Sequence, residues 1–173
     1  MNRIAVIGNG GGGKTTLSRA IAERYNLPLT HVDSIQYLAG MKVRPTDETR
    51  TILNEIANSP KWLIDGFGLI DVMENRFGKA DKIIFVDLPL WRHYWWCTKR
   101  QVQSIWAPRS ELPDGCNEAT ITHTTRLYKI LWKVHFKIRP QLQTIFKTPP
   151  IKSKVTRITN LDEWNSVFYN GFQ

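Results

Sequence analysis

The sequence contains only two cysteines, Cys97 and Cys116, which are too few for a disulfide framework and are typical of a reducing compartment. It has no apolar run of the length that a membrane span needs, and the first apolar run, residues 4–7, is too short for a signal peptide. Internal repeats and low-complexity tracts are absent as well. We therefore expect residues 1–173 to form one cytoplasmic domain without a membrane partner.

Acidic residues are scarce in one half of the chain. Residues 91–157 hold 13 lysines and arginines against 3 aspartates and glutamates, whereas residues 1–90 hold 11 against 10. The net charge of +9 therefore comes almost entirely from residues 91–157. Such a basic segment indicates an anionic partner, either phosphate groups or nucleic acid, and a solvated basic surface that binds nothing in particular is the alternative.

Glycine, in contrast, is concentrated in the stretch GNGGGGKTT at residues 8–16. A stretch of this kind is either a flexible linker or a backbone shaped to hold an anion. It satisfies the pattern G-x-x-x-x-G-K-[ST], it follows a run typical of a buried strand, and it precedes a helical pattern. That context is the context of a P-loop and argues against a linker.

In a P-loop the glycines let successive backbone N–H groups turn toward a phosphate, and the start of the next helix adds partial positive charge. Lys14 would reach the β- and γ-phosphates, and the Thr15 hydroxyl would bind Mg²⁺. We therefore expect ATP and Mg²⁺ as cofactors. The predicted ATP-binding residues are Gly8, Asn9, Gly10, Gly11, Gly12, Gly13, Lys14, Thr15 and Thr16.

The rest of the chain alternates short apolar runs with amphipathic patterns. Strands are predicted at residues 4–8, 29–33, 61–66, 81–89 and 154–160. Helices are predicted at residues 17–26, 47–58, 91–105, 122–138 and 161–169, with a restart near Pro140. Strands that alternate with helices predict a parallel sheet covered on both faces.

Three predicted strands end at or near an aspartate, namely Asp33, Asp65 and Asp87. The carboxyl ends of parallel strands open onto the crevice that holds the ligand. Asp65 is the best candidate for a Mg²⁺ carboxylate, and Asp33 is placed to orient an acceptor hydroxyl or accept its proton. Asp87 ranks lower, and each carboxylate has the alternative role of capping a turn. A switch-type GTPase is disfavoured because the chain has no N-K-x-D motif.

Basic residues follow the fourth predicted strand. They flank the Pro- and Gly-rich loop at residues 107–118 and predict a lid, at about residues 91–140, that excludes water during phosphoryl transfer. Arg100 and Arg109 are its candidate catalytic arginines, and adenine is expected near Arg100 and residues 159–161. The expected catalytic set is Lys14, Asp33, Asp65, Arg100 and Arg109. The acceptor is expected beside Asp33, Arg44, Asp65 and Arg76.

Aromatic residues gather in the same basic segment. They are Trp91, Tyr94, Trp95, Trp96, Trp106 and Trp132. One interpretation is base stacking on single-stranded nucleic acid. The other is ordinary packing, since Trp91 and Trp95 share one helix face and such stripes usually belong to a core or a lid interface.

Several motifs resemble a known family over nearly the whole chain. They are GNGGGGKTTL at 8–17, LPLTHVD at 27–33, KWLIDG at 61–66, R-x4-ADKIIFVDLP at 76–89, KR at 99–100, PRSELPDGC at 108–116 and KIRPQL at 137–142. The chain resembles the bacterial DNA topology modulation (FlaR-like) proteins, an offshoot of the adenylate kinase-like P-loop kinases. The resemblance implies ATP at residues 8–15, acceptor or Mg²⁺ carboxylates at Asp33 and Asp65, and lid arginines at Arg100 and Arg109.

The expected fold is accordingly a three-layer α/β P-loop NTPase of the adenylate kinase-like type, with a five-stranded parallel sheet in the order 2-3-1-4-5 and a helical lid. The leading hypothesis for function is a kinase that transfers the γ-phosphoryl group of ATP to a small-molecule or nucleotide acceptor. The R-x-x-G-R pattern and four-cysteine zinc lid of some adenylate kinases are absent, which argues against a nucleoside monophosphate. The alternative hypothesis is a nucleic-acid-associated, ATP-binding regulator that uses the basic segment 91–157.

Overall fold

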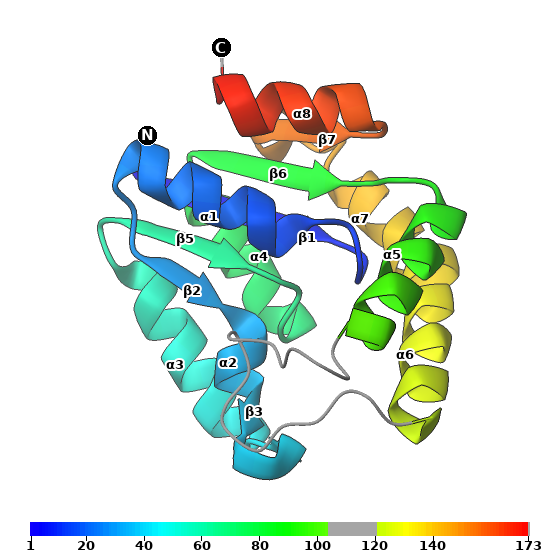
Figure 1. The fold of residues 1–173 in the computed structure, drawn as a ribbon. Helices are drawn as coiled ribbons and strands as arrows, with labels where there is room; N and C mark the ends of the chain where they lie inside the picture. Colours follow the sequence, from blue (N-terminus) through cyan, green and yellow to red (C-terminus); the bar gives the residue numbers. More distant parts are fainter. Residues whose placement is uncertain (104–120, 173) are drawn as a thin grey trace.

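Five short strands form one parallel sheet in a computed structural model, which describes residues 1–103 and 121–172 (Figure 1). The strands are β1 (Arg3–Gly8), β2 (Leu29–His31), β5 (Trp62–Asp65), β6 (Lys82–Val86) and β7 (Val155–Ile158). Their order is β2-β5-β1-β6-β7, and every neighbouring pair is parallel. The predicted order 2-3-1-4-5 is therefore confirmed, counting only the strands of this sheet.

The central strand β1 explains why the sheet is covered on both sides. Its residues 4–7 are fully buried, and successive side chains of a strand point to opposite faces. Ala5 and Ile7 belong to one hydrophobic cluster, whereas Ile4 and Val6 belong to a second cluster on the other face. A strand that buries both faces needs the continuous apolar run that this sequence has.

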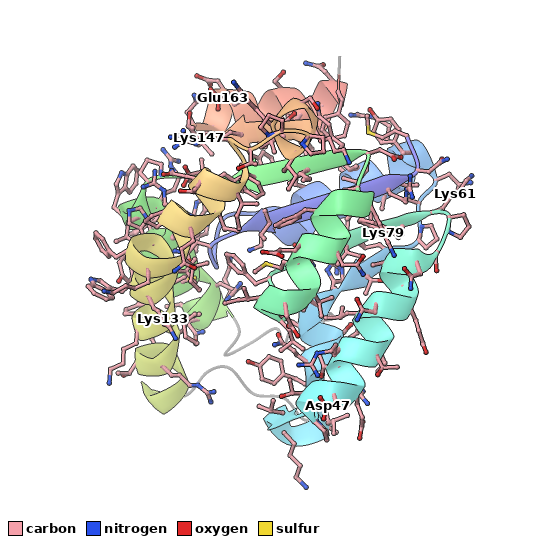
Figure 2. All side chains as sticks on the ribbon, turned by 180° about the vertical axis from the view of Figure 1, so that it is seen from behind. Asp47, Lys61, Lys79, Lys133, Lys147 and Glu163 are labelled. Carbon is pink, nitrogen blue, oxygen red and sulfur yellow. The ribbon has the colours of Figure 1, made fainter. Side chains whose placement is uncertain are left out.

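Helices supply the two outer layers of the α/β fold. One face of the sheet packs against α1 (Lys14–Tyr25) and α8 (Leu161–Asn170). The other face packs against α3 (Thr46–Asn58), α4 (Ile70–Lys79) and α7 (Arg139–Ile145). Figure 2 looks onto this second face, with Asp47 near the start of α3 and Lys79 at the end of α4. The three-layer arrangement is the predicted one.

The described residues between β6 and β7 are mostly helical. It contains α5 (Leu90–Gln103), α6 (Ile121–Lys133), a π-helical turn η2 (Val134–Ile138) and then α7. The predicted helix at 122–138 is thus divided at residue 133, ahead of the expected restart. Pro140 lies in the first turn of α7, where a missing backbone N–H costs nothing, so the chain continues as a helix through it.

Several elements have no counterpart among the predicted ones. They are α2 (Val32–Gln36), the short antiparallel pair β3 (Tyr37–Leu38) and β4 (Lys42–Val43), the 3₁₀ turns η1 (Ala39–Met41) and η3 (Ile151–Lys154), and α4. The predicted second strand was too long, because β2 ends at His31 and Asp33 belongs to α2. Within residues 1–103 and 121–172, none of the helices combines the length and apolar character that crossing a bilayer requires.

Candidate functional site

The glycine-rich stretch connects the end of β1 to the start of α1, as a P-loop does. Gly11 and Gly13 adopt positive φ values of 65° and 72°, a left-handed conformation that residues with a Cβ rarely adopt. Helix α1 begins at Lys14, directly after this turn. The partial positive charge of the helix N-terminus therefore lies beside the loop, where an anion is favoured.

Close packing is a second reason for glycine in this loop. A Cβ at Gly10 would lie 2.9 Å from Cδ2 of Leu131 on α6, and a Cβ at Gly11 would lie 2.6 Å from Sγ of Cys97 on α5. A Cβ at Gly11 would also lie 2.8 Å from the backbone oxygen of His93, so a larger residue there would push α5 away from the loop. The P-loop is therefore enclosed by α5 and α6, the helices of the predicted lid segment.

Asn9 fixes the loop to α6. Its side-chain Nδ2 donates to the carbonyl oxygen of Leu131 at 2.9 Å, and its Oδ1 accepts from the N–H of Gly10 at 2.9 Å. The Asn9 side chain is buried, so both hydrogen bonds are shielded from water. The Asn9 side chain therefore stabilises the conformation of the loop, in addition to any hydrogen bond that its backbone N–H donates to a phosphate.

Lys14 is the positive centre of the site. Its Nζ donates to the carbonyl oxygen of Asn9 at 2.8 Å. Desolvation lowers the pKa of the Lys14 ammonium, the nearby charges of Asp65 and Asp33 raise this pKa, and the charge of Arg100 lowers it. Three other predicted catalytic residues, Asp65, Asp33 and Arg100, are therefore close enough to act electrostatically on Lys14. An ammonium that donates to one carbonyl oxygen among the described residues, at this position, suits a phosphate oxygen.

Asp65 closes the site at the end of β5. Its Oδ2 accepts from the Thr15 hydroxyl at 3.3 Å, and its Oδ1 is buried without a hydrogen-bond partner among the described residues. A buried carboxylate oxygen without a partner is costly unless something else satisfies it. The hydroxyl and carboxylate oxygens of Thr15 and Asp65 are donors that Mg²⁺ prefers, so the two residues fit this ion.

Phosphate oxygens and water would complete the coordination of the Mg²⁺ ion. Within residues 1–103 and 121–172 no group of three or more His, Cys, Asp or Glu side chains surrounds a common point, as an all-protein metal cage requires. Mg²⁺ in phosphoryl-transfer sites is usually held by one or two protein ligands together with substrate phosphates. Two protein donors at this point agree with that arrangement.

His31 is a site residue that was absent from the predicted set. Its Nδ1 lies 3.1 Å from Oδ2 of Asp65, because His31 and Asp65 are register partners at the ends of β2 and β5. The sequence pattern could have indicated His31 as a site residue, since both predicted strands end in the same crevice. The predicted site residue of this segment, Asp33, lies on α2 with an exposed side chain.

Arg76 is buried on α4, a helix that the predicted elements lacked. Its Nη2 donates to the carbonyl oxygen of Phe67 at 3.0 Å, and its Nε has no hydrogen-bond partner among the described residues. Burial lowers the pKa of the Arg76 guanidinium to about 10, against the charge of Asp65, which raises it. The group thus stays charged at neutral pH and lies within the electrostatic reach of Asp65.

Arg44 lies in the chain between β4 and α3. Its Nε donates to the carbonyl oxygen of Ile35 at 2.8 Å, and its Nη1 is 3.5 Å from a carboxylate oxygen of Glu48. Arg100 is half-buried on α5 and acts on Lys14, as stated above. Arg109 and the loop at 107–118 lie outside the described residues.

Asp87, the third strand-end aspartate, has a structural role. Its buried carboxylate accepts from Arg157 at 2.6 and 2.8 Å, from Arg139 at 3.2 Å and from Gln143 at 3.2 Å. These residues belong to α7 and β7, so the ion-pair cluster joins three elements. The lower rank of Asp87 agrees with this arrangement.

His93 on α5 is buried against the P-loop. Its Nδ1 is 2.8 Å from the carbonyl oxygen of Gly10, and its Nε2 is 3.1 Å from that of Leu88. Desolvation, together with the charge of Lys14, lowers the pKa of His93 to about 4, although both carbonyl contacts favour the protonated ring. A neutral ring has one N–H and therefore donates to only one carbonyl at a time.

Comparisons with known proteins give matches among solved structures only. No family model matches the chain, and no curated protein does. A shikimate kinase from Acinetobacter baumannii, in complex with shikimate, matches with 16% identity and a TM-score of 0.47 over 87% of this chain and 96% of that chain. A shikimate kinase from Bacteroides thetaiotaomicron matches with 20% identity and a TM-score of 0.47 over 93% and 87%. The FlaR-like resemblance stays a prediction.

Proposed function

We propose that this protein is an ATP-dependent phosphotransferase that moves the γ-phosphoryl group to a small-molecule or nucleotide acceptor. The observation that carries the proposal is the meeting of Thr15 and Asp65 at 3.3 Å, next to the P-loop, with a buried Asp65 oxygen that lacks a partner. A P-loop binds a triphosphate, and the carboxylate on the neighbouring strand end supplies what Mg²⁺-assisted transfer needs.

On the donor side, the backbone N–H groups of residues 8–16 would hold the phosphates of ATP. Lys14 would exchange its hydrogen bond to Asn9 for one to a phosphate oxygen, and so stabilise the charge that develops during transfer. Thr15 and Asp65 would hold Mg²⁺, which neutralises phosphate charge. ATP as the donor supports the cytoplasm as the location.

On the acceptor side, Arg76 supplies a buried positive charge with an N–H that has no partner in the described structure. Such a group suits a carboxylate or phosphate on the acceptor. Asp65, when ionised, accepts from Nδ1–H of His31 and leaves Nε2 of that ring able to accept a proton from the acceptor hydroxyl. Asp33 and Arg44, on and near α2, would border the entrance.

The predicted lid supplies the remaining charge. Arg100 lies near Lys14 and would face the transferred group, and Arg109 would join it from the loop at 107–118. Residues 91–140 would form the lid of a single domain. Adenine would lie near Arg100 and residues 159–161, where the side-chain amide of Asn160 caps α8.

The test is a transfer assay with labelled ATP, Mg²⁺ and a panel of hydroxyl compounds that carry a carboxylate or a phosphate. We expect a labelled product with the natural protein and, with Lys14→Ala, a rate lower by about 10³-fold. Lys61→Ala is the matched control, since Lys61 is exposed and at the edge of the molecule in Figure 2. ATP binding without transfer to any acceptor would instead favour the regulator hypothesis, and absence of ATP binding would refute both.

A further inference from the structure

Four large aromatic side chains on the helices between β6 and β7 are exposed to solvent. Trp91 and Trp95 on α5 are 61% and 63% exposed, Trp132 on α6 is 50% exposed, and Phe136 in η2 is 51% exposed. Core packing is therefore the wrong explanation for these four. Trp96 does pack, against the cluster beneath α1 and α8, and Trp106 lies outside the described residues.

Helical spacing turns Trp91 and Trp95 to the side of α5 away from the buried His93 and Cys97, and the rings of Trp132 and Phe136, on α6 and η2, are 5.0 Å apart. The two helices contact each other through Tyr94 and Tyr128, whose rings are 5.1 Å apart. Trp91 and Trp95 are spaced i, i+4 on α5, and Trp132 follows Tyr128 by one turn of α6. The inner sides of the same helices, with His93, Cys97 and Leu131, are used against the P-loop.

Lysines are interspersed with the aromatic residues. Lys99, Lys129 and Lys133 are exposed on the same two helices, and Figure 2 shows Lys133 on α6. Across α5, α6, η2 and α7 the sequence has eight lysines and arginines and no aspartate or glutamate. We call the set Trp91, Trp95, Lys99, Lys129, Trp132, Lys133 and Phe136 the aromatic-basic face.

We propose that the aromatic-basic face binds single-stranded nucleic acid, with bases stacked on the exposed aromatic rings and phosphates paired with the lysines. Stacking on aromatic side chains within a positively charged track is how proteins bind single strands without sequence preference. Charge complementarity favours a polyanion, because no carboxylate on these helices opposes it. The proposal uses a surface separate from the P-loop and does not depend on phosphoryl transfer.

Other occupants fit the face less well. A second copy of the chain would bring lysines against lysines. A membrane-surface helix keeps its apolar side apart from its charged side, whereas here Lys99, Lys129 and Lys133 are exposed on the same two helices as the exposed tryptophans. Duplex DNA keeps its bases stacked inside the helix, so that the rings would have nothing to stack on.

The experiment measures binding of fluorescently labelled 15-nucleotide oligo(dT) and oligo(U) by polarisation at 50 and 200 mM salt. Trp95→Ala and Trp132→Ala should each weaken binding about 10-fold, the loss expected for one stacked base. Lys129→Ala combined with Lys133→Ala should lower the slope of log affinity against log salt by about 0.7 for each lysine. The controls are Tyr169→Ala, which removes a 69% exposed aromatic residue on α8, and Lys61→Ala.

Several results would overturn the proposal. These are no binding of either oligonucleotide at 50 mM salt, unchanged affinity in both tryptophan variants, or equal affinity for a 15-base-pair duplex. Binding to vesicles that contain phosphatidylserine but not to the oligonucleotides would assign the face to a membrane surface. A concentration-dependent dimer that Trp95→Ala abolishes would assign it to a second copy. Lys14→Ala should bind the oligonucleotides as the natural protein does, which separates this test from that of the kinase proposal.

Discussion

The hydroxyl of Thr15 and the carboxylate of Asp65 lie within hydrogen-bonding distance, 3.3 Å, although the residues are 50 positions apart in the sequence. Thr15 belongs to the first turn of α1, and Asp65 is the last residue of β5, whose register partner on β1 is Val6. The parallel pairing of β1 and β5 thus brings the P-loop and the acidic strand end together. This pairing turns two separate motifs into one candidate ion site.

Asp65→Asn tests that ion site. The amide keeps the size of the carboxylate and removes its charge, so we expect weaker Mg²⁺ binding and a turnover lower by about 10²-fold or more. Turnover measured against Mg²⁺ concentration should show a raised half-saturation point. Asp71→Asn is the matched control, because Asp71 is exposed on α4 and pairs only with Arg50 in the described structure. Equal Mg²⁺ dependence in Asp65→Asn and the natural protein would contradict the assignment.

Arg76→Met tests the acceptor side. Methionine fills much of the same volume without the charge, so we expect KM for an anionic acceptor to rise by about 10²-fold, while KM for ATP changes little. Removing one charge from a buried pair usually lowers stability, so the unfolding midpoint of the variant is measured as well, and KM is compared below the unfolding transition. Arg50→Met, on the exposed face of α3, provides the control. A rise in KM for ATP alone would move Arg76 to the donor side.

His93 predicts a pH dependence of stability. Because the pKa of His93 falls to about 4 in the folded protein from an ordinary 6.5, the unfolded chain binds the proton more tightly. Stability contributed by the neutral ring is therefore present above pH 6.5 and is lost as the pH falls toward 4. The shift corresponds to about 3 kcal/mol over that window.

The comparison with His93→Gln isolates this contribution. Glutamine retains a donor for the carbonyl oxygen of Gly10 and does not titrate. Urea unfolding at a series of pH values between 4 and 7 should show a flatter dependence in the variant. Carboxylates with lowered pKa, such as Asp81, lose their contribution at lower pH and do so in both proteins. Identical slopes would show that His93 keeps an ordinary pKa.

The sequence predicts the P-loop and the sheet order because both rest on local patterns. A continuous apolar run such as residues 4–7 is typical of a central strand that is buried on both faces of a parallel sheet. The glycine motif at the end of this run predicts a P-loop conformation. The chain order of strands and helices then leaves few topologies.

The parts that escaped prediction depend on which segments meet in space. His31 enters the site only because β2 pairs with β5 in a register that opposes it to Asp65. Arg76 is buried because α4 packs on the sheet through Val72, Met73 and Phe77. The charged residues of this short helix made its apolar side difficult to recognise in the sequence. The exposure of Trp95 likewise follows from α5 turning His93 and Cys97 toward the P-loop.

Asp87→Asn separates structure from chemistry among the strand-end aspartates. Its buried carboxylate holds Arg139 and Arg157 together, so removing the charge leaves two guanidinium groups close to one another without compensation. We expect the free energy of unfolding to fall by about 3 kcal/mol, as when one partner of a buried ion pair is removed. Below the unfolding transition, turnover and KM for ATP should change less than about threefold. Asp71→Asn, which breaks the exposed pair with Arg50, should cost much less stability. Turnover that falls as steeply as in Asp65→Asn, with the folded state intact, would show that Asp87 takes part in the chemistry.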